Sequence, residues 1–167
     1  MKEVVQTLIK LGKTISTMES CTGGALASSI TDIEGASEVL KFSAVTYSNE
    51  FKIKMGVDEN IINQYSVYSI ETANQMSKNI SLFTNSDYGV GITGKLNRID
   101  VNNLFGNDNT VFISIYDKEN DKYYEYSVDV SNATRRENKD LVIDYIERKI
   151  LEVLNYGKEF VYRKSNK

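Results

Sequence analysis

The sequence passes from a strand pattern to a helix pattern through Thr17-Met18-Glu19-Ser20-Cys21-Thr22-Gly23-Gly24. Apolar alternation over 14–18 is typical of a strand, and the small-residue run over 25–30 is typical of a helix. Ser20 and Cys21 therefore fall in a tight turn between the two elements. The two glycines allow close approach of backbone, and free N–H groups at a helix start favour a bound anion. A structural alternative is Thr22 as the N-cap, followed by glycines suited to the turn.

Hydrophobic periodicity outside this turn predicts further helices and strands. We expect helices at 4–11, 51–55, 58–64 and from Ser69 onward, strands at 39–47 and 88–92, a hairpin at 110–116 and 123–130, and loops at 31–37 and 95–109. The helix after Ser69 is predicted to bury one face made of Ala73, Met76, Ile80 and Phe83. A last helix, introduced by the capping-box pair Thr134 and Glu137, is predicted to bury Ile143, Ile146, Ile150 and Val153.

This order of elements indicates an α/β layered domain with a mixed sheet. We expect one domain over residues 1–160 and a frayed tail over 161–167. Three loops, at 19–23, 47–52 and 93–95, follow predicted strands. Because ligands of open α/β sheets bind beyond the carboxyl ends of strands, these loops are expected to share one crevice.

Composition excludes several kinds of site. The chain has 167 residues, a net charge of −3, one cysteine and no histidine. The absence of histidine excludes Ser-His-Asp and Cys-His catalysis and His-ligated metals, and a single cysteine excludes an internal disulfide or a thiolate metal cluster. The charge gives no reason to expect nucleic-acid binding, and no apolar run approaches the roughly 20 residues that span a bilayer. We therefore expect a cytoplasmic protein with no metal site, no nucleic-acid partner and no membrane contact.

Ser20 is the first candidate nucleophile of the predicted turn. Without histidine, its proton must pass to another group, and Lys52 and Tyr47 are the candidates, one helical turn apart. A lysine accepts a proton at neutral pH only if burial or nearby cations lower its pKa from about 10.4. The structural alternative for this pair is a solvated lysine and a surface tyrosine.

The residues on either side of Ser20 allow two interpretations each. Cys21 is a competing nucleophile, although a small buried apolar role suits a free cysteine better. Glu19 is either an acceptor for loop amides or an anchor for Lys52. The sequence leaves both choices open.

Two arginines stand at the start of the last predicted helix. Arg135 and Arg136 lie in its first turn, which is the unfavourable end for a cation in the field of the helix dipole. A bound anion such as a phosphate would offset this mismatch, and simple solvation is the alternative.

Together these segments resemble the CinA carboxy-terminal domain family, which includes the nicotinamide-nucleotide amidohydrolases. The resemblance runs from about Thr14 to the last helix, and it rests on Glu19-Ser20-Cys21-Thr22-Gly23-Gly24, on Val45-Thr46-Tyr47-Ser48-Asn49-Glu50 with Lys52, and more weakly on Gly91-Ile92-Thr93-Gly94 and Thr110-Val111-Phe112-Ile113. It implies a three-layer α/β/α sandwich around a mixed, mainly parallel sheet with a C-terminal hairpin, assembled as a homodimer. It also implies an enzyme of NAD salvage, without metal or cofactor, that deamidates nicotinamide mononucleotide to nicotinate mononucleotide and ammonia.

The resemblance also assigns roles to single residues. Ser20 matches the family's nucleophile, and Tyr47 and Lys52 match its activating partners. The positions implied to bind the substrate are Glu19, Cys21, Thr22, Gly23, Gly24, Asn49, Thr93 and Gly94, with Arg135 or Arg136 on the phosphate side.

The chain departs from the family after Gly94. The family continues with an Ala-Gly-Pro loop and further glycines, whereas this chain reads Lys95-Leu96-Asn97-Arg98-Ile99-Asp100. Lys139 stands nearest to a second arginine of the family. Because side chains block contacts that glycine permits, a reshaped pocket is expected. Two alternatives to the deamidase follow: a non-catalytic relative that binds a nucleotide or a protein partner, and a Ser-Lys amidase for another small amide.

Overall fold

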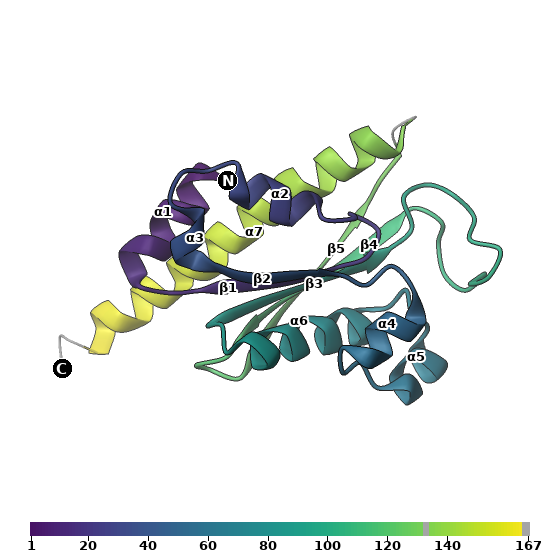
Figure 1. Cartoon of the computed structure of the whole chain (residues 1–167), viewed down its shortest axis with the longest axis horizontal. Coiled ribbons are helices and arrows are strands. Elements are labelled where there is room, and N and C mark those ends of the chain that lie inside the picture. Colours follow the sequence, from purple (N-terminus) through teal and green to yellow (C-terminus); the bar gives the residue numbers. More distant parts are fainter. Residues whose placement is uncertain (132–133, 165–167) are drawn as a thin grey trace.

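The computed structural model describes residues 1–131 and 134–164, and it has three layers, with helices on both faces of one sheet (Figure 1). The strands are β1 (Ile15–Glu19), β2 (Leu40–Val45), β3 (Tyr88–Gly94), β4 (Thr110–Asp117) and β5 (Lys122–Asp129). The helices are α1 (Lys2–Leu11), α2 (Ala25–Thr31), α3 (Ala36–Val39), α4 (Asn49–Lys54), α5 (Glu59–Tyr65), α6 (Ile70–Thr84) and α7 (Arg135–Lys164). None of the helices among these residues is long and apolar enough to cross a membrane.

The sheet is mixed, with strand order β2-β1-β3-β4-β5. Strands β1, β2 and β3 are parallel, and β4 pairs antiparallel with both β3 and β5. Strand β4 therefore runs against the other four, and the predicted C-terminal hairpin is β4–β5. The predicted α/β fold with a mixed, mainly parallel sheet is confirmed.

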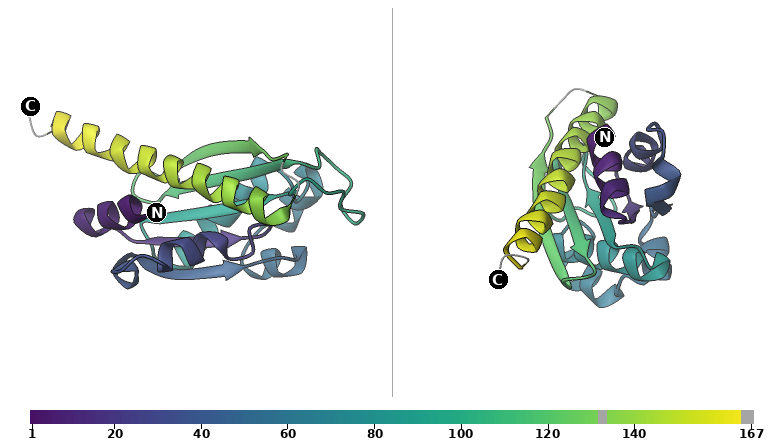
Figure 2. Two further views of the ribbon diagram at one scale, coloured as in Figure 1. Left: turned by 90° about the horizontal axis from the view of Figure 1, so that it is seen from above. Right: turned by 90° about the vertical axis from the view of Figure 1, so that its left-hand side faces the viewer.

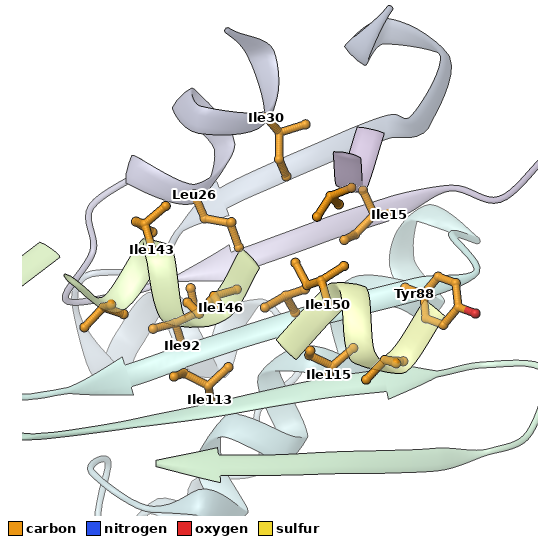
Figure 3. Packing of buried hydrophobic residues seen from close by; sticks show 14 of the residues in the cluster. Ile15, Leu26, Ile30, Tyr88, Ile92, Ile113, Ile115, Ile143, Ile146 and Ile150 are labelled. Atoms are coloured by element: carbon orange, nitrogen blue, oxygen red, sulfur yellow. The ribbon is translucent and has the colours of Figure 1, made fainter. Parts of the chain in front are cut away.

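The larger core lies between one sheet face and α1, α2, α3 and α7 (Figures 1 and 2). Figure 3 shows its centre, where isoleucines of α7 face isoleucines of the sheet. The predicted stripe of the last helix supplies these residues, since Ile143, Ile146, Ile150 and Val153 are all buried. The spacing of apolar residues along α7 therefore placed that helix correctly on the sheet.

The second core packs α6, with α4 and α5 nearby, against the other sheet face. Two glycines of β3 let α6 approach closely, because a Cβ at Gly91 would lie 2.3 Å from the carbonyl oxygen of Ala73. Met76 and Ile80 are buried as predicted, but Phe83 is 68% exposed and corrects the predicted stripe. The last turn of α6 reaches the sheet edge, where Phe83 contacts Phe42 of β2 at 5.7 Å between ring centroids.

Element boundaries differ from the predictions around β2. Val39 belongs to the short helix α3, so the predicted loop at 31–37 ends in a helix that begins at Ala36. Strand β2 stops at Val45, and Tyr47 lies outside it. The helix predicted at 51–55 begins earlier, because the Ser48 hydroxyl accepts a hydrogen bond from the amide of Phe51 and caps α4.

Local capping signals were read correctly at α7. The Thr134 hydroxyl accepts from the amide of Glu137, whose carboxylate accepts from the amide and hydroxyl of Thr134. This helix continues to Lys164, and residues 165–167, the end of the segment expected to fray, lie outside the described residues.

Candidate active site

The turn after β1 is held mainly by its own backbone. The amide of Ser20 donates to the carbonyl oxygen of Ile92 on β3 (3.0 Å), and the carbonyl oxygen of Ser20 accepts from the amide of Gly23 (3.0 Å). Gly23 and Gly24 have positive φ angles of 61° and 93°, which suit glycine. Gly24, and not Thr22 as in the structural alternative, is the N-cap of α2. Ser20 is therefore placed at a rigid corner between strand and helix.

The Glu19 side chain holds the turn through hydrogen bonds to the start of α2. Its fully buried carboxylate accepts hydrogen bonds from the amides of Leu26 (3.0 Å) and Ala27 (2.9 Å) and from the hydroxyl of Thr22 (2.7 Å). A carboxylate at a helix start satisfies amides that have no partner within the helix. Of the two interpretations left open, Glu19 is the acceptor for backbone amides.

Lys52 reaches Ser20 from the neighbouring strand connection. Strands β1 and β2 are parallel neighbours, so the segments after their carboxyl ends lie side by side, and α4 follows β2. The Nζ atom of Lys52 lies 3.0 Å from Oγ of Ser20 and 2.7 Å from the carbonyl oxygen of Thr46. The side chain is only 1% exposed and makes no ion pair in the part of the chain that the structure describes.

The surroundings set the proton affinities of this pair. Burial lowers the pKa of Lys52 to about 8, because the ammonium has lost water without gaining a carboxylate. Burial also raises the pKa of the Cys21 thiol to about 12, despite the nearby positive charges of Lys52 and Arg135. A neutral amine at Lys52 is thus accessible near neutral pH and can take the proton of a hydroxyl 3.0 Å away. A thiolate at Cys21 is strongly disfavoured, in keeping with its burial.

Tyr47 and the two arginines occupy the outer part of the site. The Tyr47 side chain is 66% exposed, and its hydroxyl accepts a hydrogen bond from Arg135 (3.3 Å). No hydrogen bond joins it to Ser20 or Lys52 in the described structure. Arg136 has a different partner, since it forms an ion pair with Asp140 one turn along α7 (3.2 Å). The structure therefore separates the two arginines and places Arg135 with Tyr47.

A cleft of about 560 Å³ opens beside the turn, between α2 and α7. Its end at the turn carries Thr22, Gly23, Arg135 and Lys139, and it continues along Ala25, Ser28, Ser29, Asp32, Arg136, Asp140, Ile143 and Asp144. A Cβ at Gly23 would lie 3.2 Å from Nζ of Lys139. The glycine thus leaves space in which this ammonium stands next to the Ser20 turn. Positive charge and free space occur together at this end of the cleft.

The end of β3 and the segment after it lie next to the Ser20 turn, because the Ser20 amide donates to the carbonyl oxygen of Ile92. Thr93 is fully buried, and its hydroxyl donates to the carbonyl oxygen of Val67 (2.9 Å). Lys95 does not extend into solvent. Its side chain is 2% exposed, pairs with Asp108 (3.0 Å) and lies over the ring of Tyr68 at 5.2 Å. Of the residues that follow Gly94, Lys95 and Leu96 are therefore packed into the fold, whereas Ile99 is 62% exposed.

Two contributors to the site escaped the sequence analysis. The carbonyl oxygen of Thr46 holds Lys52, and Tyr68 packs beneath Lys95 while its hydroxyl donates to Asp100. No local pattern marks either contact, because the first depends on the path of the chain between β2 and α4 and the second joins residues 32 positions apart. Asn49, expected to bind substrate, is half-buried as the first residue of α4.

Residues 1–143 match the CinA C-terminal domain family. A CinA-like protein of Endomicrobium trichonymphae is 32% identical over 151 residues, which is 89% of this chain and 35% of that protein. A CinA-like protein of Desulforapulum autotrophicum is 42% identical over 94 residues, or 56% of this chain and 22% of that protein. This chain thus spans about a quarter to a third of the length of these curated relatives.

Solved structures agree with this match. A CinA superfamily protein of Klebsiella pneumoniae superposes with a TM-score of 0.83 at 21% identity, over 93% of this chain and 95% of that chain. A competence/damage inducible protein of Agrobacterium tumefaciens superposes with a TM-score of 0.78 at 26% identity, over 92% and 94% of the two chains. The chain belongs to the CinA C-terminal domain family.

Proposed function

We propose that this chain is an amidohydrolase that cleaves the carboxamide of a nicotinamide nucleotide, with Ser20 as nucleophile and Lys52 as general base. The observation that carries the proposal is the 3.0 Å contact between Oγ of Ser20 and Nζ of Lys52, made inside the protein and without a carboxylate on the lysine. This is the geometry that a serine needs in order to lose its proton to an amine.

The reaction would proceed through an acyl-enzyme. Ser20 attacks the amide carbon as its proton passes to Lys52, and the carbonyl oxygen becomes an oxyanion. The turn already uses the amides of Ser20 and Gly23 in its own hydrogen bonds, and among the described residues those of Cys21 and Thr22 donate to no backbone oxygen. These two amides are the donors that we assign to the oxyanion.

The outer part of the site suits the rest of a nucleotide. Arg135 and Lys139 bring positive charge to the end of the cleft at the turn, where a phosphate is the natural ligand. Tyr47 is held at this entrance by Arg135, so we assign it to the substrate ring. Deamidation of nicotinamide mononucleotide and a homodimeric assembly stay proposals taken from the resemblance.

Ammonia release from nicotinamide mononucleotide tests this function directly. The full chain is expected to release ammonia, Ser20→Ala to lose the activity, and Cys21→Ala to keep it. An active CinA family protein assayed in parallel is the positive control. No release by the folded chain, or loss in Cys21→Ala with retention in Ser20→Ala, would contradict the proposal.

A second candidate is a relative that binds a nucleotide without turning it over. The packing of Lys95 against Tyr68 and Asp108 favours it, because side chains now fill a wall that the family builds with glycine. Calorimetric titration with nicotinamide mononucleotide separates the two candidates. Tight binding with no ammonia release supports the second, and turnover supports the first.

A further inference from the structure

Thr46 carries a buried hydroxyl that makes no hydrogen bond to any residue in the described ranges. The residue is 2% exposed. A buried polar group without a partner destabilises a fold, because it has lost water and gained nothing. Asn74 has the other such oxygen among the described residues, but its amide nitrogen donates to Glu125 (2.6 Å). The Thr46 side chain has no second polar atom to offset its burial.

The backbone of Thr46 belongs to the reactive pair. Its amide donates to the carbonyl oxygen of Glu19 (2.8 Å), and its carbonyl oxygen accepts from Nζ of Lys52 (2.7 Å). That same Nζ atom contacts Oγ of Ser20. The unpartnered hydroxyl therefore belongs to the residue whose carbonyl oxygen holds the amine that would move protons.

We propose that the Thr46 hydroxyl binds the leaving nitrogen of the substrate amide and, once ammonia has left, the water that hydrolyses the acyl-enzyme. This assignment rests on the proposed amidohydrolase function. Both groups must approach Lys52, because one amine gives a proton to the leaving nitrogen and later takes a proton from the water. The leaving nitrogen and the water therefore occupy one position, and a single oxygen beside Lys52 serves both.

The steps balance as follows. The Ser20 oxygen forms a bond to the amide carbon while its proton passes to Lys52. Lys52 gives that proton to the nitrogen, the C–N bond breaks, and ammonia leaves a serine ester. Water then bonds to the ester carbon as one of its protons passes to Lys52, the Ser20 ester bond breaks, and Lys52 returns the proton to Ser20. Thr46 accepts an N–H in the first half and an O–H in the second, and its own protonation never changes.

Two replacements of Thr46 separate this role from packing. Thr46→Val keeps the shape and removes the hydroxyl, whereas Thr46→Ser keeps the hydroxyl. Thr46→Val is expected to lower the rate of ammonia release by at least about tenfold while Tm is unchanged or higher. Thr46→Ser is expected to stay within about threefold of the parent. Loss of rate without loss of stability is the signature of a group kept for chemistry.

Thr72→Val is the matched control. Thr72 is also fully buried, but its hydroxyl donates to the carbonyl oxygen of Ser66 (2.9 Å). Removing a satisfied hydrogen bond should lower Tm and leave turnover unchanged. Thr46→Val should therefore lower turnover without lowering Tm, whereas Thr72→Val should lower Tm without lowering turnover.

An activated ester isolates the second half of the reaction. With p-nitrophenyl acetate the phenolate leaves without a proton, so acylation of Ser20 does not require Thr46. Thr46→Val should give a stoichiometric burst of nitrophenolate followed by a steady rate at least about tenfold below that of the parent. If the parent releases no ammonia but hydrolyses the ester, the nicotinamide function fails and the ester still decides the role of Thr46. If Thr46→Val turns over within about twofold of the parent, or the parent acts on neither substrate, the proposal is overturned.

Discussion

Two buried lysines follow neighbouring strands of the sheet, and their partners differ. Lys52 comes after β2, is 1% exposed, and its Nζ atom has two hydrogen-bond partners among the described residues, the Ser20 hydroxyl and the Thr46 carbonyl oxygen. Lys95 comes directly after β3, is also buried, and pairs with the carboxylate of Asp108. An ammonium beside a carboxylate is compensated, whereas one beside neutral oxygens is not. Burial alone therefore does not mark a reactive lysine, and the partner decides.

The segments that carry the two lysines are built differently as well. Lys52 sits on a capped helix next to a backbone-bonded turn. Lys95 begins a long connection that projects from the end of the sheet near α4 (Figure 1). This connection exposes four large apolar side chains, Ile99, Val101, Leu104 and Phe105. Lys52, the proposed general base, is thus on a capped helix, and the connection that begins at Lys95 is a loop held by side-chain contacts.

Exchange of each lysine for methionine is the strongest test of this contrast. Lys52→Met should lower the rate of ammonia release by about 10²–10⁴-fold, the usual contribution of a general base. Tm should not fall, because an uncompensated buried ammonium is replaced by an apolar chain. Lys95→Met should lower Tm and retain most of the activity. This exchange removes the ion pair between the buried Lys95 and Asp108 and leaves Asp108 without its partner.

Lys54→Met is the control for both exchanges. Lys54 is on the same helix as Lys52, but it is exposed and pairs with Glu50 one turn away. Both the rate and Tm should be unchanged, since exposed pairs contribute little. Equal loss of activity in Lys52→Met and Lys95→Met would show that the two lysines do not differ in the way their partners indicate.

The pH dependence is the next largest effect. With a pKa of about 8, Lys52 is mainly protonated below that value, and the rate should fall about tenfold per pH unit there. Stability changes in the same direction. Between about pH 8 and pH 10.5 the unfolded chain binds more protons at this residue than the folded chain, so the free energy of unfolding rises with pH. The gain is up to about 3 kcal/mol, and it is measured as the difference between the parent and Lys52→Met in denaturant titrations. A flat difference across this window would contradict the lowered pKa.

Much of the scaffold could be predicted because its signals are local. The period of α7 identified its buried face, and the pair Thr134 and Glu137 identified its start. Phe83 was misplaced because periodicity does not show where a helix passes the sheet edge. The α3 boundary was missed because four residues are too few for a period.

The sequence could predict which residues of the site lie close together but not which contacts they make. Loops after parallel strands indicated that Ser20 and Lys52 would lie close together, and Nζ of Lys52 is 3.0 Å from Oγ of Ser20. The sequence could not show that the Thr46 carbonyl oxygen holds Lys52, since this contact depends on the path of the chain after β2. It could not separate Arg135 from Arg136 either, because the helix phase relative to Tyr47 decides which one faces the site.

Glu19→Gln should produce an intermediate effect, on stability. A glutamine oxygen can still accept one hydrogen bond, but its amide group would turn a donor toward the helix amides that the carboxylate now binds. The cost is about 1–3 kcal/mol, which is typical for a buried donor left without an acceptor. Denaturant unfolding measures it, and Glu34→Gln, on an exposed loop, is the control. An unchanged free energy of unfolding would mean that the turn does not depend on this carboxylate.

Tyr68→Phe should produce the smallest effect, confined to the loop after β3. The Tyr68 hydroxyl donates to Asp100, and this bond is the main cause that lowers the pKa of the Asp100 carboxyl. Its loss should cost about 1 kcal/mol and speed trypsin cleavage after Arg98, which lies in the same loop. Tyr65→Phe, which removes a half-exposed phenol on α5, should leave cleavage unchanged.

The stability difference between the parent and Tyr68→Phe at acid pH shows whether it depends on the charge of Asp100. A carboxyl whose folded pKa is lowered stabilises the fold above its ordinary pKa of about 3.9, and that contribution disappears as the pH falls through the folded value. The gap in Tm between parent and Tyr68→Phe should therefore be constant from neutral pH to about pH 4 and close below it. A gap that persists in acid would mean that the Tyr68 hydroxyl orders the loop independently of the Asp100 charge, because the ring packed under Lys95 is present in both proteins.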